Sequence, residues 1–155
     1  SLTTGEVIRV LRGHSGYVFS VAISKTDQYI VSGSRDSTVR VWSLTSGDLI
    51  RVLQGHGSWV YSVAISNDEQ FVVSGSRDKT IRVWSLTSGE TTQVLRGHTG
   101  AVLSVNLSSD DKYLVSGSGG YGDKSVRIWD LSTGQQTQEL QGHTNDVWSV
   151  NLIQA

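Results

Sequence analysis

Residues 13–42 read GHSGYVFSVAISKTDQYIVSGSRDSTVRVW, and residues 55–84 read GHGSWVYSVAISNDEQFVVSGSRDKTIRVW. Aligning 13–54 with 55–96 gives 26 identities in 42 positions without a gap. The same Gly-His pair begins two further stretches, at Gly97 and Gly142. A period of about 40–45 residues is typical of stacked repeats, in which one unit cannot bury its apolar faces alone. The repeat therefore decides the fold, and function becomes a question about the surface of the assembled units.

Each unit is predicted to form four short β-strands and shows no helical period. In the first unit the strands are expected at 18–23, 29–32, 38–43 and 49–53, with turn residues between them. Val and Ile alternate along them as in sheets that are covered on both faces. Val18 and Val21 are both apolar but an odd number of residues apart, which predicts a β-bulge in the first strand.

The complete units are predicted at 13–54, 55–96 and 97–141. A partial unit lies at each end of the chain. Residues 2–12 match 44–54 and predict an orphan fourth strand, while 142–152 match the first strand of a further unit. We therefore expect three whole sheets flanked by two single strands.

Four residue types recur at equivalent positions: the His of Gly-His, the first Ser of Ser-Gly-Ser, a turn Asp and a Trp in the third strand. The three sets are His14, Ser32, Asp36 and Trp42; His56, Ser74, Asp78 and Trp84; and His98, Ser116, Asp123 and Trp129. In this order and at this period, the motifs resemble the WD40 β-propeller family over essentially the whole chain. Only Trp129 is followed by the Asp of the family name, and the family's Pro-Asp-Gly turn is absent. The resemblance implies an all-β propeller segment of four-stranded antiparallel blades, with three complete blades plus flanking strands.

The resemblance also implies that each set forms a structural tetrad, one hydrogen-bonded chain inside its blade. The chemistry is sensible, because an indole N–H needs an acceptor, a hydroxyl both accepts and donates, and an imidazole can link that hydroxyl to a carboxylate. Ser, His and Asp together also suggest a nucleophilic triad. Their recurrence in every unit argues against catalysis, since a catalytic site is ordinarily singular and no oxyanion donor is evident.

A second motif, Gly117–Gly122, fits the G-x-G-x-x-G pattern of dinucleotide-binding loops. That function requires a helix to follow, so that its N-terminus meets the pyrophosphate. Residues 124–129 instead read as a strand, so we interpret the motif as a three-residue insertion in a turn of the third unit. Asn106-Leu107-Ser108 matches a glycosylation sequon but falls within a predicted strand.

Composition excludes several classes of function. Thirteen Lys and Arg oppose fourteen Asp and Glu, so a net charge of −1 gives no electrostatic case for a nucleic-acid partner. No apolar run approaches about 18 residues, so no membrane insertion is expected. There is no Cys, P-loop or metal-binding cluster, so we expect no metal, no cofactor and no enzymatic activity. The sequence shows no signal peptide, which favours an intracellular, cytoplasmic protein.

In propellers of this family, three positions per blade crowd the narrow face around the central channel. They are the first-strand positions three and five residues after the motif His, and the residue before the turn Asp. The resemblance thus implies a partner-binding top face made of Tyr17, Phe19, Arg35, Trp59, Tyr61, Arg77, Leu103, Tyr121, Asp146 and Trp148. Aromatic and Arg side chains dominate binding hot spots. The alternative is that the first-strand aromatics fill space between blades.

We therefore expect a non-enzymatic scaffold that binds a protein or peptide over its top face, with Arg35 and Arg77 meeting acidic groups. The alternative is a structural subunit of a larger assembly, contacting its neighbours through blade edges and outer strands. The leftover strands predict that the ring is completed by blades of a longer chain or by homo-oligomerisation. On this reading residues 1–155 alone are not a stable monomer.

Overall fold

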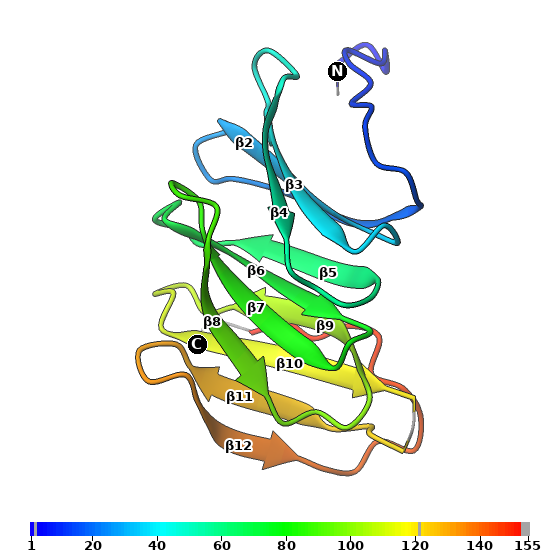
Figure 1. Ribbon diagram of the computed structural model, residues 1–155, viewed down its shortest axis with the longest axis vertical. Coiled ribbons are helices and arrows are strands. Elements are labelled where there is room, and N and C mark those ends of the chain that lie inside the picture. The colour runs from blue at the N-terminus through cyan, green and yellow to red at the C-terminus, as the bar shows by residue number, and fades with distance from the viewer. Residues whose placement is uncertain (2, 121, 153–155) are drawn as a thin grey trace.

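The computed structural model of the chain describes residues 1, 3–120 and 122–152, and it contains strands, turns and loops. Twelve strands form three antiparallel four-stranded sheets, each built from consecutive strands. The strands are β1 (Val18–Ile23), β2 (Tyr29–Ser34), β3 (Thr38–Ser43), β4 (Leu49–Gln54), β5 (Val60–Ile65), β6 (Phe71–Ser76), β7 (Thr80–Ser85), β8 (Thr91–Arg96), β9 (Ala101–Leu107), β10 (Tyr113–Gly119), β11 (Val126–Asp130) and β12 (Gln135–Leu140). The sheets stack face to face in chain order, and they do not close into a ring (Figure 1). The expected all-β blade architecture is confirmed.

The predicted β-bulge is confirmed. The register between β1 and β2 shifts between Val18 and Ser20, and the equivalent shift between β5 and β6 lies between Val60 and Ser62. The extra residue turns the side chains of Val18 and Val21 toward one face of the sheet, although their spacing is odd. Each blade thereby presents two valines from its first strand to the preceding blade.

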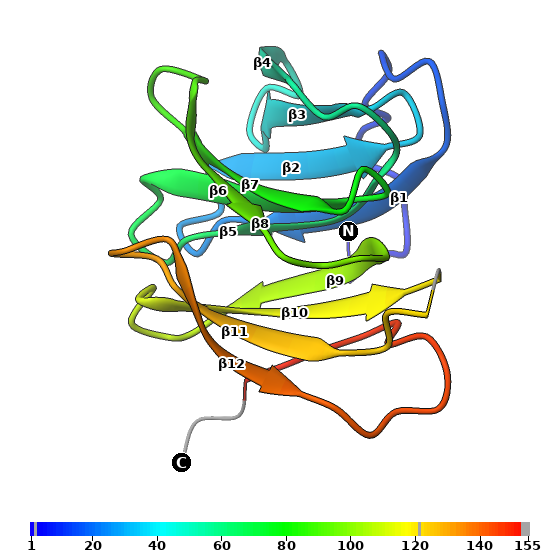
Figure 2. The same ribbon diagram turned by 60° about the horizontal axis from the view of Figure 1, so that its bottom comes forward.

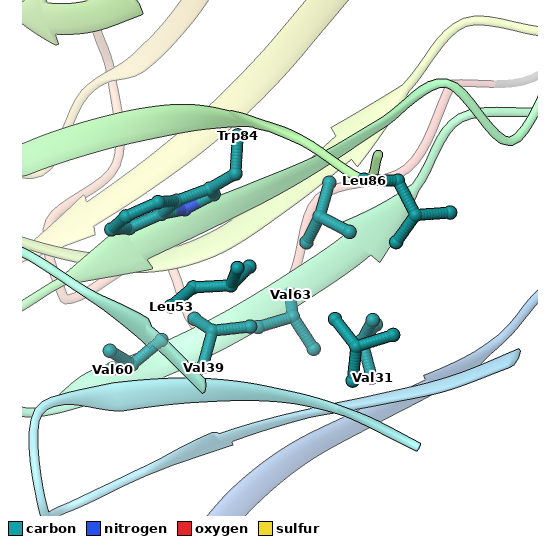
Figure 3. Packing of buried hydrophobic residues seen from close by; sticks show 9 residues of the cluster. Val31, Val39, Leu53, Val60, Val63, Trp84 and Leu86 are labelled. Atoms are coloured by element: carbon teal, nitrogen blue, oxygen red, sulfur yellow. The ribbon is translucent and has the colours of Figure 1, made fainter. Parts of the chain in front are cut away.

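The hydrophobic core lies between blades rather than inside one blade. Between the first two blades, Val31, Val39 and Leu53 meet Val60 and Val63, all nearly inaccessible to solvent. Figure 3 shows these side chains from neighbouring sheets pointing toward one another. A second cluster between the second and third blades repeats the arrangement, with Val73 and Ile81 against Val102 and Val105. Apolar burial at roughly 25 cal/mol per Å² makes these two interfaces the main source of stability.

The outer edges of the blades are linked by strand-to-turn contacts. The Arg51 guanidinium on β4 donates to the carbonyls of Leu86, Thr87 and Ser88 in a turn of the second blade. At the equivalent position on β8, Gln93 donates to the carbonyl of Leu131 over 2.8 Å. These contacts close the wide side of each interface, far from the first strands.

The structure corrects the prediction of strands at 2–12 and 142–152. The described residues of both ranges form no strand. The physical reason is that a strand needs a hydrogen-bonded neighbour, and the described chain places no third strand beside 3–12 and no second strand beside 142–152. Both segments nevertheless pack on the sheets. Arg9 donates to the carbonyl of Ser46 over 2.6 Å, and Val147 is buried against the third blade.

Candidate partner-binding face

One hydrogen-bonded chain runs through the interior of the second blade. The Trp84 indole N–H donates to the Ser74 hydroxyl over 2.8 Å, and Ser74 Oγ lies 2.8 Å from His56 Nε2. His56 Nδ1 lies 2.8 Å from a carboxylate oxygen of Asp78. With Asp78 ionised, Nδ1 carries the proton toward the carboxylate and Nε2 accepts from the hydroxyl. Every polar group of the chain then has a partner, as buried polar groups require.

The other two blades place their four residues in the same contacts. In the first blade, His14 lies 2.8 Å from Asp36 and 2.7 Å from Ser32 Oγ, which also accepts from Trp42. In the third blade, the corresponding bonds join His98, Asp123, Ser116 and Trp129, with distances between 2.7 and 3.0 Å. His143 lies in a loop on the surface.

A hydroxyl two residues after each turn Asp extends the chain, and the sequence analysis missed it. Thr38, Thr80 and Ser125 donate to Asp36, Asp78 and Asp123 over 2.6 to 2.7 Å. The signal was present, because Thr or Ser recurs at this position in all three units.

Hydrogen bonds decide the charge of the turn carboxylates. Burial disfavours the ionised form of Asp36, but bonds from Thr38 and His14 outweigh it and hold its pKa at about 2. The pKa values of Asp78 and Asp123 are lowered further by the same kinds of bond against the same opposing burial. Burial lowers the pKa of His98, against the attraction of Asp123. The tetrad histidine of the third blade is therefore neutral and its aspartate ionised at neutral pH.

This geometry does not suit nucleophilic catalysis. Ser32, Ser74 and Ser116 are buried, and each hydroxyl is already engaged by an indole and an imidazole. Substrate would have to displace the core to reach them. Among the described residues, no group of three or more His, Asp or Glu side chains is placed to hold a metal ion.

The Gly-rich motif leads into a strand, as predicted. Gly117 and Gly119 lie on β10, and the next element is β11 rather than a helix. Asn106 of the sequon-like triplet lies on β9 and donates its side-chain N–H to Asn151 over 2.7 Å. Within the described part of the chain, no helix is long and apolar enough to cross a membrane.

The first-strand and turn positions of the first two blades come together around Trp59. Arg35 and Arg77 each stack on the Trp59 ring, with guanidinium carbons 4.6 and 4.5 Å from ring centroids. Arg35 also lies 5.6 Å from the Tyr17 ring, which is 70% exposed. Phe19 packs against both Trp59 and Tyr61, with centroids 6.0 and 5.2 Å apart. We call these six residues the aromatic-arginine cluster: Tyr17, Phe19, Arg35, Trp59, Tyr61 and Arg77.

The remaining predicted top-face residues border the same cluster. Leu103, Asp146 and Trp148 line one hollow with Trp59, Tyr61 and Arg77. Trp148 is 71% exposed, whereas Leu103 is buried and the Asp146 carboxylate accepts from the Gly120 backbone N–H over 2.9 Å. Tyr121 lies outside the described residues.

The hollow has a floor that the sequence analysis did not include. Ala101 and Gly119 line it, at the positions occupied by Tyr17 and Arg35 in the first blade. Small residues at these two positions leave a concavity where the other blades present large side chains. The substitution is visible in the aligned repeats and could have been found there.

Comparisons with known proteins follow the repeats. The family model described as "WD domain, G-beta repeat" matches residues 5–43, 47–85 and 89–130. Among curated proteins, the pre-mRNA-splicing factor PRP46 of Yarrowia lipolytica (strain CLIB 122 / E 150) is 40% identical over 37 residues, which are 24% of this chain and 8% of that protein. The human THO complex subunit 6 is 42% identical over 41 residues, which are 26% of this chain and 12% of that protein.

Two solved structures match over most of the chain. The structure of U3-55K gives a TM-score of 0.86 at 31% identity and covers 91% of this chain and 44% of its own. The crystal structure of RRP9 WD40 repeats gives the same TM-score and identity, with 91% and 43% covered. The chain thus spans less than half the length of these structures, and about a tenth of the curated relatives.

Proposed function

The chain belongs to the WD40 repeat family, and from that premise we propose that it is a non-enzymatic scaffold that binds a protein or peptide through its top face. WD40 propellers are a scaffold typical of protein interaction. In this proposal the structural tetrads hold each blade together and take no part in binding. The chain binds no cofactor, and its place of action is intracellular, in the cytoplasm.

The observation that carries the proposal is the stack of Arg35, Trp59 and Arg77. Each guanidinium lies over the same indole at about the same distance, which fixes both charges relative to each other. Both arginines are exposed, and the described residues offer neither of them a carboxylate or a carbonyl within hydrogen-bonding distance. A preordered pair of guanidinium groups with free donors supports binding of carboxylates, because Arg can bind them with two parallel hydrogen bonds.

The partner that this chemistry fits is an acidic protein segment with an apolar residue nearby. Carboxylates would meet Arg35 and Arg77, and an apolar side chain would enter the hollow floored by Ala101 and lined by Leu103 and Trp148. The net charge of −1 gives no electrostatic support for nucleic acid as the partner.

The test is affinity purification and peptide binding with paired variants. Trp59→Ala and Arg77→Ala should each weaken the natural partner by about 1–2 kcal/mol or more, because both lie at the centre of the cluster. A fluorescent peptide of Glu and Leu should bind the wild type more tightly than its Lys and Leu counterpart. Lys25→Ala, in the turn between β1 and β2 and far from the cluster, is the control and should change neither affinity. Equal partner affinity for wild type and the Trp59→Ala, Arg77→Ala double variant would contradict the proposal.

A second candidate is a structural subunit that contacts its neighbours through blade edges and outer strands. It is supported by the exposed valines of β1 and by the likeness to a protein named as a subunit of a complex. In either case the ring would be completed by blades of a longer chain or by homo-oligomerisation. Hydrogen exchange of a purified assembly distinguishes the two, because protection of the top face would favour the second candidate.

A further inference from the structure

The first blade exposes a face that the other blades bury. We call it the leading face: the side of the β1–β4 sheet that points away from the second blade, with Val18, Val21 and Ile23. Val18 and Val21 are 49% and 66% exposed, whereas Val60 and Val63 at the same positions of β5 are 0% and 5% exposed. Among the described residues, the segment before β1 covers only the outer part of this face, where Ile8 and Leu11 lie near Ile30 and Leu44.

The two internal interfaces show what kind of surface covers such valines. Val60 and Val63 lie directly on Gly33 of β2, where an added Cβ would come within 2.8 and 3.0 Å of their methyl carbons. The Val63 N–H donates to the Ser20 hydroxyl over 3.2 Å. Gly75, Val102 and Val105 repeat the fit, and Val105 N–H donates to Ser62 over 3.1 Å. The complement to the valine pair is therefore a bare glycine on a second strand together with a serine hydroxyl on a first strand.

The opposite end of the stack carries the same complement. We call it the trailing face: the side of the β9–β12 sheet that points away from the second blade, with Gly117 and Ser104. The segment 142–152 lies along this side (Figure 2). Its Val147 and Val150 sit against Gly117, and Val150 N–H donates to the Ser104 hydroxyl over 3.1 Å. The fit reproduces that of a following blade, residue for residue.

This segment covers the trailing face incompletely. Most of its residues are exposed, and it forms no strand ladder. The outer part of the face remains an open groove lined by Tyr113, Ile128 and Leu152. A whole blade in the same position would cover both parts, as the second blade covers the first.

We propose that the leading face of one copy of this chain docks on the trailing face of a second copy, displacing residues 142–152. Val18 and Val21 take the places of Val147 and Val150, because the spacing of the two valines is the same in both segments. The Val21 N–H then donates to the Ser104 hydroxyl of the other copy. The contact is head-to-tail, so it produces a closed ring if the rotation closes and a filament if it does not. It uses a different surface from the top face and does not rest on the proposed function.

The bound segment makes this association a competition. Asp146 accepts from Gly120 N–H, and Lys124 donates to the Thr144 carbonyl, so the insertion in the third blade holds its own segment in place. The first blade has Tyr17 where the segment has Asp146 and cannot form the first of these bonds. Weakening the segment should therefore promote docking of a second copy.

Sedimentation velocity of the full chain over about a hundredfold range of concentration tests the proposal. The wild type should form species at multiples of 16.8 kDa. Val21→Lys should weaken association at least about thirtyfold, because it places a charge in an apolar contact and touches no partner within its own chain. Val94→Lys, on the exposed side of β8, is the matched control and should associate as the wild type does. Val147→Ala should strengthen association about tenfold by loosening the segment.

A peptide of residues 142–152 added in trans should dissociate the assemblies by occupying the trailing face. If the wild type is a monomer throughout, association of Val147→Ala that Val21→Lys abolishes still supports the proposal. Monomers for both the wild type and Val147→Ala would overturn it. Association of Val21→Lys at wild-type strength, or assemblies indifferent to the peptide, would also overturn it, because the contact would then involve other faces.

Discussion

The valines of β1 and β5 occupy equivalent strand positions in nearly identical repeats, yet one pair faces solvent and the other is buried in the largest apolar cluster. Their local sequences are Val-Phe-Ser-Val and Val-Tyr-Ser-Val, and both strands carry the same bulge. The difference lies in the neighbour: Gly33 and Val31 of the first blade cover Val60 and Val63. The comparison shows that each repeat specifies two matching faces, while burial depends on the presence of the adjacent blade.

The largest expected effect tests the glycine under the valine pair. Gly75→Val should destabilise the protein by about 3 kcal/mol, because its Cβ alone would approach Val102 within 2.7 Å between two full blades. Gly117→Val should cost about 1 kcal/mol, since the segment that lies on it can move away. Urea unfolding measures both. Equal losses would mean that 142–152 is held as rigidly as a complete blade.

The next effect tests whether the tetrads stabilise the blades. Trp84→Phe should lower the free energy of unfolding by about 1–3 kcal/mol, because the Ser74 hydroxyl loses its indole donor inside the core. Trp148→Phe is the control, since that exposed indole donates to no described residue and should change stability little. Coincident denaturant midpoints for Trp84→Phe and the wild type would show that the tetrad is dispensable in the second blade.

A direct test of the comparison truncates one valine from each pair. Val63→Ala removes two buried carbons and should cost about 1.5 kcal/mol. Val21→Ala at the equivalent exposed position should stay within about 0.5 kcal/mol at concentrations where the chain is monomeric. A loss of similar size at Val21 would show that the leading face is covered in solution, and its dependence on concentration would identify a second copy as the cover.

The smallest effect is on the pH dependence of stability. The pKa of Asp36 is held at about 2 instead of 3.8, and those of Asp78 and Asp123 are also lowered, so their contribution is present above pH 3.8 and is lost as the pH falls through the folded-state values. The pKa of His98 is lowered from 6.5, so the unfolded chain takes up that proton first and stability also declines below pH 6.5. Denaturant midpoints measured across this range should fall in two stages. His98→Gln should remove the upper stage only.

Much of the fold follows from the sequence because the repeat marks it four times over. The 42-residue period, the Val18–Val21 spacing and the Trp of each third strand predicted the sheets, the bulge and the apolar clusters. The strands at 2–12 and 142–152 were predicted from likeness alone, and that failed because strand formation depends on hydrogen-bonded neighbours as well as on local sequence.

The candidate site was predictable in its members but not in its geometry. The positions of Arg35, Trp59 and Arg77 followed from the resemblance to a family. That both guanidiniums share one indole depends on side-chain directions across two blades, which repeat spacing does not encode. The hollow at Ala101 and Gly119 was overlooked because the search considered large side chains, whereas the feature is made by small ones.

The serine-to-amide bonds between first strands have a consequence for how such a protein can grow. They join Ser20 to Val63, Ser62 to Val105 and Ser104 to Val150, so each unit recognises only the unit that follows it. An in-frame duplication of 42 residues would set every new valine over a glycine and every new amide opposite a hydroxyl without a compensating mutation elsewhere. Length is therefore the property of this molecule that evolution can change in a single genetic event, and the near-identity of its first two units is what a recent event of that kind would leave behind.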